Sequence, residues 1–255
     1  MEHSRNEKIK DKNFWKVWFK VVHTSYIPHS HIVHQILNQL NYNVRDLKIL
    51  EIGAGTGRDS WLLAKYGAQA FALDYATTRT IREKFHSDNL PLICIQADGE
   101  NLPFKDKFFD LVFSQGLIEH FRNPEKLIRE QIRVLKNGGY LVIDAPQTYS
   151  LYNIYKTALI RLDNWPIVWE RSYSVRDMKK IGKKYNLKLL KLSGWDVWPL
   201  FLRNMHKTKI RGRNALPKKI RQLIEMQWRK FENTKPAAYI AMNITAVFQK
   251  VETQQ

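Results

Sequence analysis

The sequence has little cysteine, few acidic side chains and no apolar run of membrane-spanning length. The single cysteine, Cys94, excludes an intrachain disulfide, and no Cys/His cluster has zinc spacing, so we expect neither a disulfide framework nor a metal site. The first apolar run, Phe14 to Val22, is short and interrupted by lysines, so we expect neither an ordinary signal peptide nor a membrane-spanning helix there. These features predict a protein of a reducing compartment, and we expect a cytoplasmic location.

The shortage of acidic residues makes the chain strongly basic. It has 42 Lys and Arg against 24 Asp and Glu, which gives a net charge of +18. Such a surface attracts the phosphates of nucleic acids, anionic lipids or acidic metabolites. Between residues 171 and 235 the chain has 19 basic and four acidic residues. Most of the excess charge therefore lies in the C-terminal third.

The chain is 44% hydrophobic, and its length suits one domain. Short apolar segments alternate with helical patterns along most of it. Strands are expected at 48–52, 70–73, 92–96, 109–114, 140–144 and 187–192, with a further apolar run at 237–248. Helices are expected at 14–23, 30–40, 58–66, 76–86, 124–136, from 174 onward and at 217–231, the one at 124–136 being ended by Asn137-Gly138-Gly139. This alternation predicts an α/β fold, a doubly wound and mostly parallel sheet with room for one antiparallel strand.

A glycine-rich turn, Glu51-Ile-Gly53-Ala-Gly55-Thr-Gly57, follows the first expected strand. Closely spaced glycines let the backbone approach a ligand, and the helix that follows offers free N–H groups at its positive end. A dinucleotide fingerprint would need glycine or alanine at 58 or 60, where Arg58 and Ser60 stand, and the Lys-Ser/Thr pair of a P-loop is absent. The turn therefore predicts a nucleotide-like cofactor of another kind, the alternative being a turn without a ligand.

Two aspartates follow the next two expected strands. Asp74 ends the strand at 70–73, where a carboxylate can accept hydrogen bonds from both ribose hydroxyls, and Tyr75 beside it can pack against an adenine. Asp98 follows the strand at 92–96, where a carboxylate oxygen can accept a hydrogen bond from an exocyclic amine. Taken singly, each aspartate is as readily a turn or cap residue. Their joint position at successive strand ends, where open α/β sheets bind ligands, favours a binding site.

At this point residues 47–145, and more weakly 170–192, resemble the class I S-adenosylmethionine-dependent methyltransferase superfamily. The resemblance is to its small-molecule group, similar to quinone-biosynthesis methyltransferases. The matching elements are Glu51-x-Gly53-x-Gly55-x-Gly57, the acidic Asp74, Ala97-Asp98-Gly99 with Leu102-Pro-Phe104, Phe109-Asp-Leu-Val112, Glu119-His-Phe121 and Leu135-Lys-Asn-Gly-Gly139. The resemblance implies a seven-stranded Rossmann-like sheet with its last hairpin reversed.

The resemblance also implies S-adenosylmethionine as methyl donor and S-adenosylhomocysteine as product. It implies that the glycine turn holds the methionine portion, that Asp74 binds the ribose and that Asp98 binds the adenine edge. The predicted cofactor-binding residues are Glu51, Gly53, Gly55, Gly57, Asp74, Tyr75, Asp98, Gly99 and Gln115. His120 follows the fourth strand, near the expected acceptor, and is a candidate general base because imidazole titrates near neutrality. The alternative is that His120 only shapes the pocket.

The residues after the fourth strand narrow the methyl acceptor. Ser114-Gln-Gly-Leu117 stands where nucleic-acid amino-methyltransferases of this superfamily carry an Asn/Asp-Pro-Pro-aromatic loop. Cys94 is predicted inside a strand and is no candidate for the nucleophile of a cytosine C5 enzyme. O-, N- or C-methylation of a small-molecule or lipid-linked acceptor, including a phosphate-bearing one, is therefore the leading hypothesis. An RNA methyltransferase and a non-catalytic cofactor-binding protein are the alternatives.

We expect a single methyltransferase domain over 1–255, divided into four parts. The core at 47–145 would be covered by an N-terminal helical lid at 1–46 and an insert at 146–172, both rich in aromatic residues. Residues 173–255 would complete the sheet and carry a basic helical segment at 195–232, in which large apolar side chains alternate with cations. A solvated basic face is the leading interpretation of that segment, and the pairing of apolar and cationic side chains makes peripheral contact with an anionic membrane the first alternative, ahead of RNA binding. The oligomeric state is not predicted.

Overall fold

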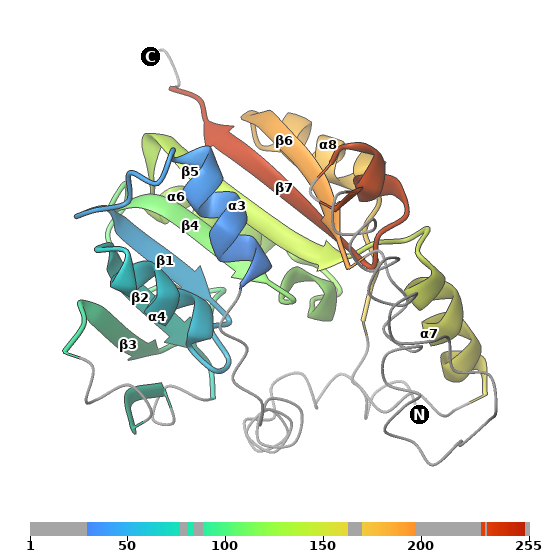
Figure 1. Ribbon diagram of the computed structural model, residues 1–255, viewed down its shortest axis with the longest axis horizontal. Helices are drawn as coiled ribbons and strands as arrows, with labels where there is room; N and C mark the ends of the chain where they lie inside the picture. The colour runs from blue at the N-terminus through green and yellow to red at the C-terminus, as the bar shows by residue number, and fades with distance from the viewer. Residues whose placement is uncertain are drawn as a thin grey trace, which may run out of the picture.

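The computed structural model describes residues 30–76, 81–83, 89–162, 170–196, 231–232 and 234–252. In these residues a single sheet is flanked by helices (Figure 1). The strands are β1 (Lys48–Ile52), β2 (Gln69–Asp74), β3 (Leu92–Gln96), β4 (Phe109–Gln115), β5 (Leu135–Pro146), β6 (Leu187–Trp195) and β7 (Asn243–Lys250). The helices are α3 (His31–Gln39), α4 (Arg58–Lys65), α6 (Glu125–Val134), α7 (Leu151–Arg161) and α8 (Val175–Lys184), with short 3-10 helices η3 (Ile118–His120) and η4 (Pro236–Tyr239).

The seven strands are arranged in the order β3-β2-β1-β4-β5-β7-β6. Pairs among β1 to β5 are parallel, whereas β7 is antiparallel to both β5 and β6. The strand order reverses direction at β1, so β1 and its neighbour β4 form the topological switch point at which such sheets bind ligands. The predicted fold class is confirmed, including the single antiparallel strand.

Alternate residues of the central strands pack on opposite faces of the sheet. In β4, Leu111 and Phe113 pack with α3 and α4, whereas Val112 packs with α6 and α8. The same alternation separates Ile49 from Leu50 in β1. Helices therefore cover both faces, as Figure 1 shows, and both faces need apolar side chains. This explains why the strands are continuous apolar runs in the sequence.

Helix starts follow the predicted capping chemistry. The Ser30 side chain accepts a hydrogen bond from the backbone N–H of Val33 and caps α3. At α8, Ser174 accepts from the Asp177 backbone while the Asp177 carboxylate accepts from the Ser174 backbone, which completes a capping box. Both caps confirm the helix starts expected at these serines.

The junction between α6 and β5 differs from the prediction. The helix ends at Val134 rather than at about Lys136, and β5 begins at Leu135 rather than at Tyr140. Leu135 is fully buried and pairs with Phe109, so burial draws the chain into the sheet before the glycines are reached. The register shifts before the next pair, Leu111 with Tyr140, so Asn137-Gly138-Gly139 form an irregularity within the strand.

The predicted lid lies partly outside the described residues. The segments 14–23 and 217–231, and most of 76–86, were expected to be helical and fall largely outside them. Inside them, α3 packs its Ile32 and Ile36 against the sheet and belongs to the core. The lid predicted for 1–46 therefore does not include α3 and stays a prediction for residues 1–29. No described helix is long and apolar enough to cross a membrane.

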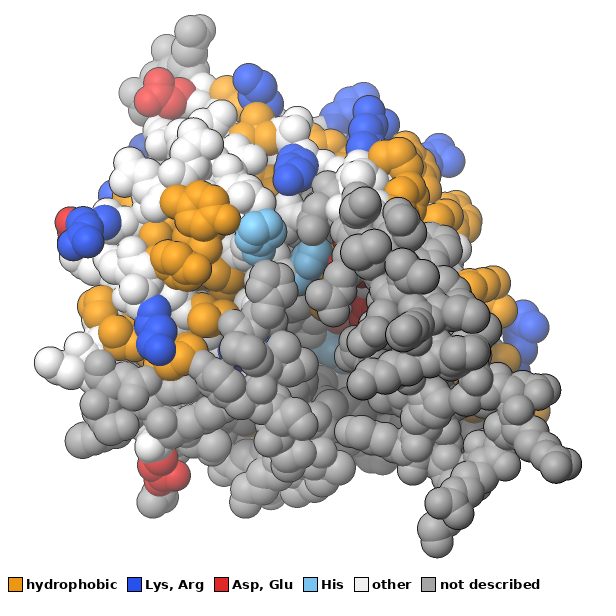
Figure 2. Space-filling view, viewed as in Figure 1, with side chains coloured by type: hydrophobic (Ala, Val, Ile, Leu, Met, Phe, Trp, Pro, Cys, Tyr) orange, Lys and Arg blue, Asp and Glu red, His pale blue; other side chains and the backbone are white. Residues whose placement is uncertain are grey.

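In the insert at 146–172, α7 has an inverted polarity. Lys156 is buried, whereas Leu151, Ile154 and Tyr155 are exposed. In the space-filling view, apolar side chains lie along the edge of the molecule where α7 runs in Figure 1 (Figure 2). The described part of the insert thus turns aromatic and aliphatic side chains outward and does not enclose a pocket with them.

Candidate cofactor site

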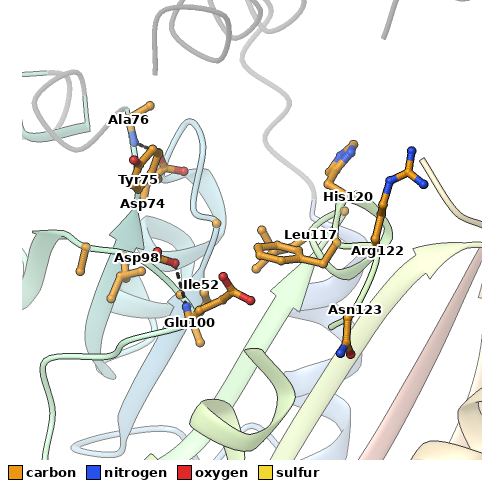
Figure 3. Close-up of a pocket in the computed structure, with 16 residues that line it drawn as sticks. Ile52, Asp74, Tyr75, Ala76, Asp98, Glu100, Leu117, His120, Arg122 and Asn123 are labelled. Carbon is orange, nitrogen blue, oxygen red and sulfur yellow. Dashed lines mark hydrogen bonds between the residues drawn. The ribbon is translucent and has the colours of Figure 1, made fainter. Parts of the chain in front are cut away.

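A pocket of about 320 Å³ opens at the carboxyl ends of β1, β2, β3 and β4. One wall is built from the ends of β1, β2 and β3, and the facing wall from the segment that follows β4 (Figure 3). The lining residues are Ile52, Gly53, Leu73, Asp74, Tyr75, Ala76, Ala97, Asp98, Gly99, Glu100, Gly116, Leu117, His120, Phe121, Arg122 and Asn123. Most of its surface is apolar, with carboxylates at the edge, which is the usual make-up of a small-molecule site.

The glycine turn brings the backbone of β1 to the pocket. The N–H groups of Gly53 and Ala54 both donate to the carbonyl of Leu73, which holds the turn against the end of β2. Gly53 has a φ of +74°, and a Cβ placed there would lie 3.0 Å from Leu117 Cδ1 on the facing wall. A side chain at residue 53 would therefore be strained and would narrow the pocket.

Asp74 is fixed at the end of β2 by two backbone groups. Its carboxylate oxygens accept from Gly55 N at 2.9 Å and from Ala76 N at 2.7 Å. The side chain is 6% exposed and lines the pocket. Each carboxylate oxygen has a further lone pair, so Asp74 can accept hydrogen bonds from a ligand while it stays in place. Gly55 thus acts through Asp74, because its own N–H is directed at that carboxylate.

Glu51 lies beneath the turn and not in the pocket wall. Its carboxylate accepts from Ser60 N at 2.9 Å and from Ser60 Oγ at 2.5 Å, so it ties the end of β1 to the first turn of α4. Burial, and then the nearby Asp59 carboxylate, raise the pKa of Glu51 well above its usual range. Glu51 is therefore a candidate for positioning the turn.

Gly57 is also placed by packing. It has a φ of +70°, and a Cβ there would lie 2.4 Å from Ile81 Cγ2. Gly57 thus lies against the core side chain of Ile81 and does not line the pocket. Glycine is required at residue 57 because the positive φ and the nearby Ile81 both disfavour a side chain there.

The second predicted carboxylate comes from the loop after β3. Asp98 Oδ1 accepts from Glu100 N at 2.9 Å, which fixes the loop and leaves the side chain at the pocket. A Cβ at Gly99 would lie 2.9 Å from Leu127 Cδ1 of α6 and 3.0 Å from Ile52 Cγ2 of β1, so glycine lets the loop lie close to both. Tyr75 lines the same wall, and its carbonyl accepts from Gln96 Nε2 at 3.1 Å. Figure 3 shows Asp74, Tyr75, Asp98 and Glu100 grouped on one side.

The facing wall is formed by Leu117 and by η3 with the residues after it. His120, Arg122 and Asn123 lie there, opposite Asp74 and Asp98 (Figure 3). His120 thus lines the pocket on the wall opposite Asp74 and Asp98. Gln115, predicted to line the pocket, pairs with Asp144 at the end of β4 and is not among the lining residues.

The structure therefore separates the predicted residues into two groups. Gly53, Asp74, Tyr75, Asp98, Gly99 and His120 line the pocket, whereas Glu51, Gly55, Gly57 and Gln115 support it from behind or beside it. The sequence reasoning missed Phe121, Arg122 and Asn123, which directly follow the Glu119-His120 element. Following the chain past that element would have found them.

Buried charged groups lie beside the pocket on the side of β4 and β5. Lys156 of α7 donates to Glu170 at 3.0 Å and to Ser172 at 2.7 Å, and the side chains of this ion pair are 3% and 5% exposed. Glu119 is buried, and its Oε2 has no hydrogen-bond partner among the described residues. Burial raises the pKa of Glu119 well above its usual range. Lys156 and Glu170 come together only in the folded chain, so no sequence pattern predicted their ion pair.

Asp144 at the end of β5 is a second buried carboxylate. It accepts from Trp195 Nε1 at 2.7 Å and from Thr245 Oγ1 at 2.5 Å, which joins β5 to both β6 and β7. Burial raises the pKa of Asp144 to about 7, although both hydrogen bonds lower it. In the part of the chain that the structure describes, no group of three or more His, Cys, Asp and Glu side chains is arranged to hold a metal ion.

Residues 50–143 match the family described as "Methyltransferase domain". The chain is 37% identical over 117 residues to a demethylmenaquinone methyltransferase of Corynebacterium urealyticum, covering 45% of this chain and 49% of the relative. It is 31% identical over 173 residues to a malonyl-[acyl-carrier protein] O-methyltransferase of a Marinomonas species, covering 66% of this chain and 63% of the relative. The chain thus spans between half and two thirds of the length of these two relatives.

The fold is shared with a solved methyltransferase structure. Phosphoethanolamine N-methyltransferase 2 of Haemonchus contortus, solved in complex with S-adenosyl-L-methionine, superposes with a TM-score of 0.64 at 16% identity, covering 95% of this chain and 58% of that one. The likeness to the superfamily noted from the sequence elements is confirmed by the family match and by the strand order. Residues 50–143 therefore match the methyltransferase-domain family, and the described chain has the class I methyltransferase fold.

Proposed function

We propose that the protein transfers a methyl group from S-adenosylmethionine to a small-molecule or lipid-linked acceptor. The observation that carries this proposal is the pocket at the switch point of the sheet, lined on one side by Asp74 and Asp98 and on the other by His120. The family match of residues 50–143 and the names of the relatives support it. S-adenosylhomocysteine would be the product.

The residues present fit this cofactor. Apolar side chains of Ile52, Leu73 and Leu117 form walls against which a flat ring system can pack, and the two aspartates stand at the polar edge. Glycine suits the cradle, because a side chain at residue 53 would be strained at its φ of +74° and a Cβ at residue 53 or 99 would crowd Leu117 or Leu127. Asp74 would accept from the ribose hydroxyls and Asp98 from the adenine amine, because both carboxylates are already oriented by backbone N–H groups.

Tyr75 would pack against the adenine, and the backbone at Gly53 would meet the methionine portion. Gly55 and Glu51 would act indirectly, Gly55 by orienting Asp74 and Glu51 by holding the turn to α4. Gly57 and Gln115 would contribute only through the shape of the turn and of the end of β4. This division refines the sequence-based expectation, in which all of these residues contacted the cofactor.

The bound cofactor supplies a methyl group on a sulfonium, which is already an activated leaving group. The protein then has to bring an acceptor atom into line with that methyl, and proximity of this kind can supply effective molarities of about 10⁵ M or more. The wall formed by Leu117, His120 and Phe121 is placed to orient the acceptor. His120 is the candidate general base for an acceptor that must lose a proton. The alternative is that His120 only shapes the wall.

The acceptor class is inferred from the relatives and from the make-up of the pocket. The two relatives named above act, by their names, on a demethylmenaquinone and on a malonyl group held by acyl carrier protein. Both acceptors are apolar or carrier-bound molecules, which suits a mostly apolar pocket. We propose no metal cofactor, a cytoplasmic location and peripheral contact with anionic membrane, the last resting on the basic character of the chain.

A labelling experiment separates the three functional classes. The purified full chain is incubated with S-adenosylmethionine that carries a tritiated methyl group and with a cell extract, which is then divided into organic-soluble, aqueous small-molecule, RNA and protein fractions. Label in either small-molecule fraction supports the proposal. Label in RNA would favour the RNA methyltransferase, and binding of the cofactor without any transfer would favour a non-catalytic protein.

A further inference from the structure

A second cavity, here called the basic groove, lies between the start of α6 and the helix α8. It has a volume of about 630 Å³. Its lining includes five cationic residues, Arg122, Arg171, Lys180, Lys183 and Lys184, and two acidic ones, Glu125 and Asp177. The lining therefore has a net charge of 5 − 2 = +3. None of these residues was assigned a role from the sequence.

The acidic residues neutralise only part of this charge. Lys184 pairs with Glu125, and Arg171 lies 3.7 Å from an Asp177 oxygen. Lys180 and Lys183 are exposed and form no ion pair with a carboxylate among the described residues. Two ammonium groups are thus available on one wall of the groove. A fixed set of cations around a cavity attracts a multiply charged anion more strongly than the same charges spread over a surface.

The start of α6 adds to the positive potential. Pro124, Glu125 and Ile128 line the groove, and Pro124 occupies the N-cap position, where it offers no side-chain acceptor. The N-terminus of a helix of this length carries a partial positive charge. Such ends bind phosphates in many proteins. The first backbone N–H of α6, that of Glu125, already donates to Asn123 Oδ1 at 3.1 Å, so the groove depends mainly on its cationic side chains. The lysines of α8 and the N-terminal end of α6 therefore lie around the same cavity.

The basic groove adjoins the candidate cofactor site. Arg122 and Asn123 line both cavities, so a molecule lying in the groove reaches the wall that carries His120. On this geometry, and granting the proposed methyl transfer, we infer that the basic groove binds a phosphate group of the methyl acceptor. The phosphate would be held by Lys180, Lys183 and Arg171, with the reacting end of the acceptor directed past Asn123 into the pocket.

The test measures phosphate binding directly, independently of methyl transfer. Inorganic pyrophosphate is titrated into the full chain at about 0.15 M salt, which screens the general surface charge, and binding is followed by calorimetry. In the variant Lys180→Gln/Lys183→Gln we expect affinity to fall by about tenfold or more, because two charge-assisted contacts are lost. The matched control is Arg176→Gln/Lys179→Gln, which removes two exposed charges from the same helix outside the groove. In this control variant the affinity for pyrophosphate should fall by less than about twofold.

Equal losses in the two variants would overturn the inference, since they would show attraction to the general field of the protein. Failure of the wild type to bind pyrophosphate at millimolar concentration would overturn it as well. Dioctanoyl phosphatidic acid, titrated in parallel, distinguishes a lipid phosphate from a free one by its greater affinity. S-adenosylhomocysteine affinity, measured in every variant, should stay unchanged. A wild type that binds pyrophosphate but not S-adenosylhomocysteine would count against the proposed function and not against the groove.

Discussion

The two halves of the sheet are held together by different kinds of contact. In the half built from β1, β2 and β3, the site rests on backbone hydrogen bonds and glycines, such as the contact from Gly55 to Asp74, 19 residues apart. In the half built from β5, β6 and β7, buried charged and polar side chains are paired over long distances, such as Asp144 with Thr245, 101 residues apart. The first half is specified by motifs, whereas the second depends on the completed fold.

The difference has a physical cause. A cofactor shared by many proteins needs a fixed backbone, and backbone positions are encoded locally by glycines and strand ends. Buried charges are stable only when their partners are in place. Lys156, Glu170 and Asp144 therefore depend on partners that only the completed fold brings to them.

The largest effect should come from breaking the buried ion pair. Lys156→Met leaves Glu170 without its charged partner in a buried site, and we expect the free energy of unfolding to fall by about 3–5 kcal/mol. Urea denaturation measures this. Lys184→Met, which breaks the exposed pair with Glu125, should cause a much smaller change.

The double variant Lys156→Met/Glu170→Met sharpens the same comparison. It removes both charges and should recover most of the lost stability. If Lys156→Met were no more destabilising than Lys184→Met, the buried ion pair would contribute no more to stability than the exposed one.

A pair of glycine variants tests the cofactor half. Gly57 and Gly138 have φ values of +70° and +75°, but only Gly57 has a neighbour that a Cβ would strike, Ile81 at 2.4 Å. Gly57→Ala should therefore lose about 2–4 kcal/mol of stability, from both strain and overpacking, and Gly138→Ala about 1 kcal/mol from strain alone. Thermal unfolding of both variants checks this. Equal losses would mean that packing against Ile81 does not hold the turn.

The pH dependence of stability tests the other half. Since burial raises the pKa of Asp144 from 3.8 to about 7, the folded state keeps a proton that the unfolded state has lost. This contribution to stability is full below pH 4 and is lost as the pH rises through 7. Asp144→Asn can keep both hydrogen bonds and cannot ionise. Between pH 5 and 8 the wild type should therefore lose on the order of 2 kcal/mol more than the variant. Parallel pH profiles would show that Asp144 is ionised in the fold throughout.

These contrasts also show how far the sequence could predict the molecule. Alternating segments and strand-end aspartates were sufficient for the fold class and for Asp74 and Asp98, because backbone geometry alone brings those residues to the pocket. The start of β5 was misplaced because Leu135 pairs with Phe109, a contact visible only in the folded sheet. The pair of Lys156 and Glu170 was missed for the same reason, since a lysine on an exposed apolar helix carries no local sign of burial.

The central claim is that the pocket at the switch point binds S-adenosylmethionine through the Asp74 carboxylate. Calorimetry of S-adenosylhomocysteine with the wild type should show one site per chain. Asp74→Asn should weaken binding by about 1.5–3 kcal/mol through loss of charge-assisted hydrogen bonds, whereas the exposed Asp46→Asn should leave it unchanged. Undiminished affinity in Asp74→Asn, or no binding by the wild type, would contradict the account.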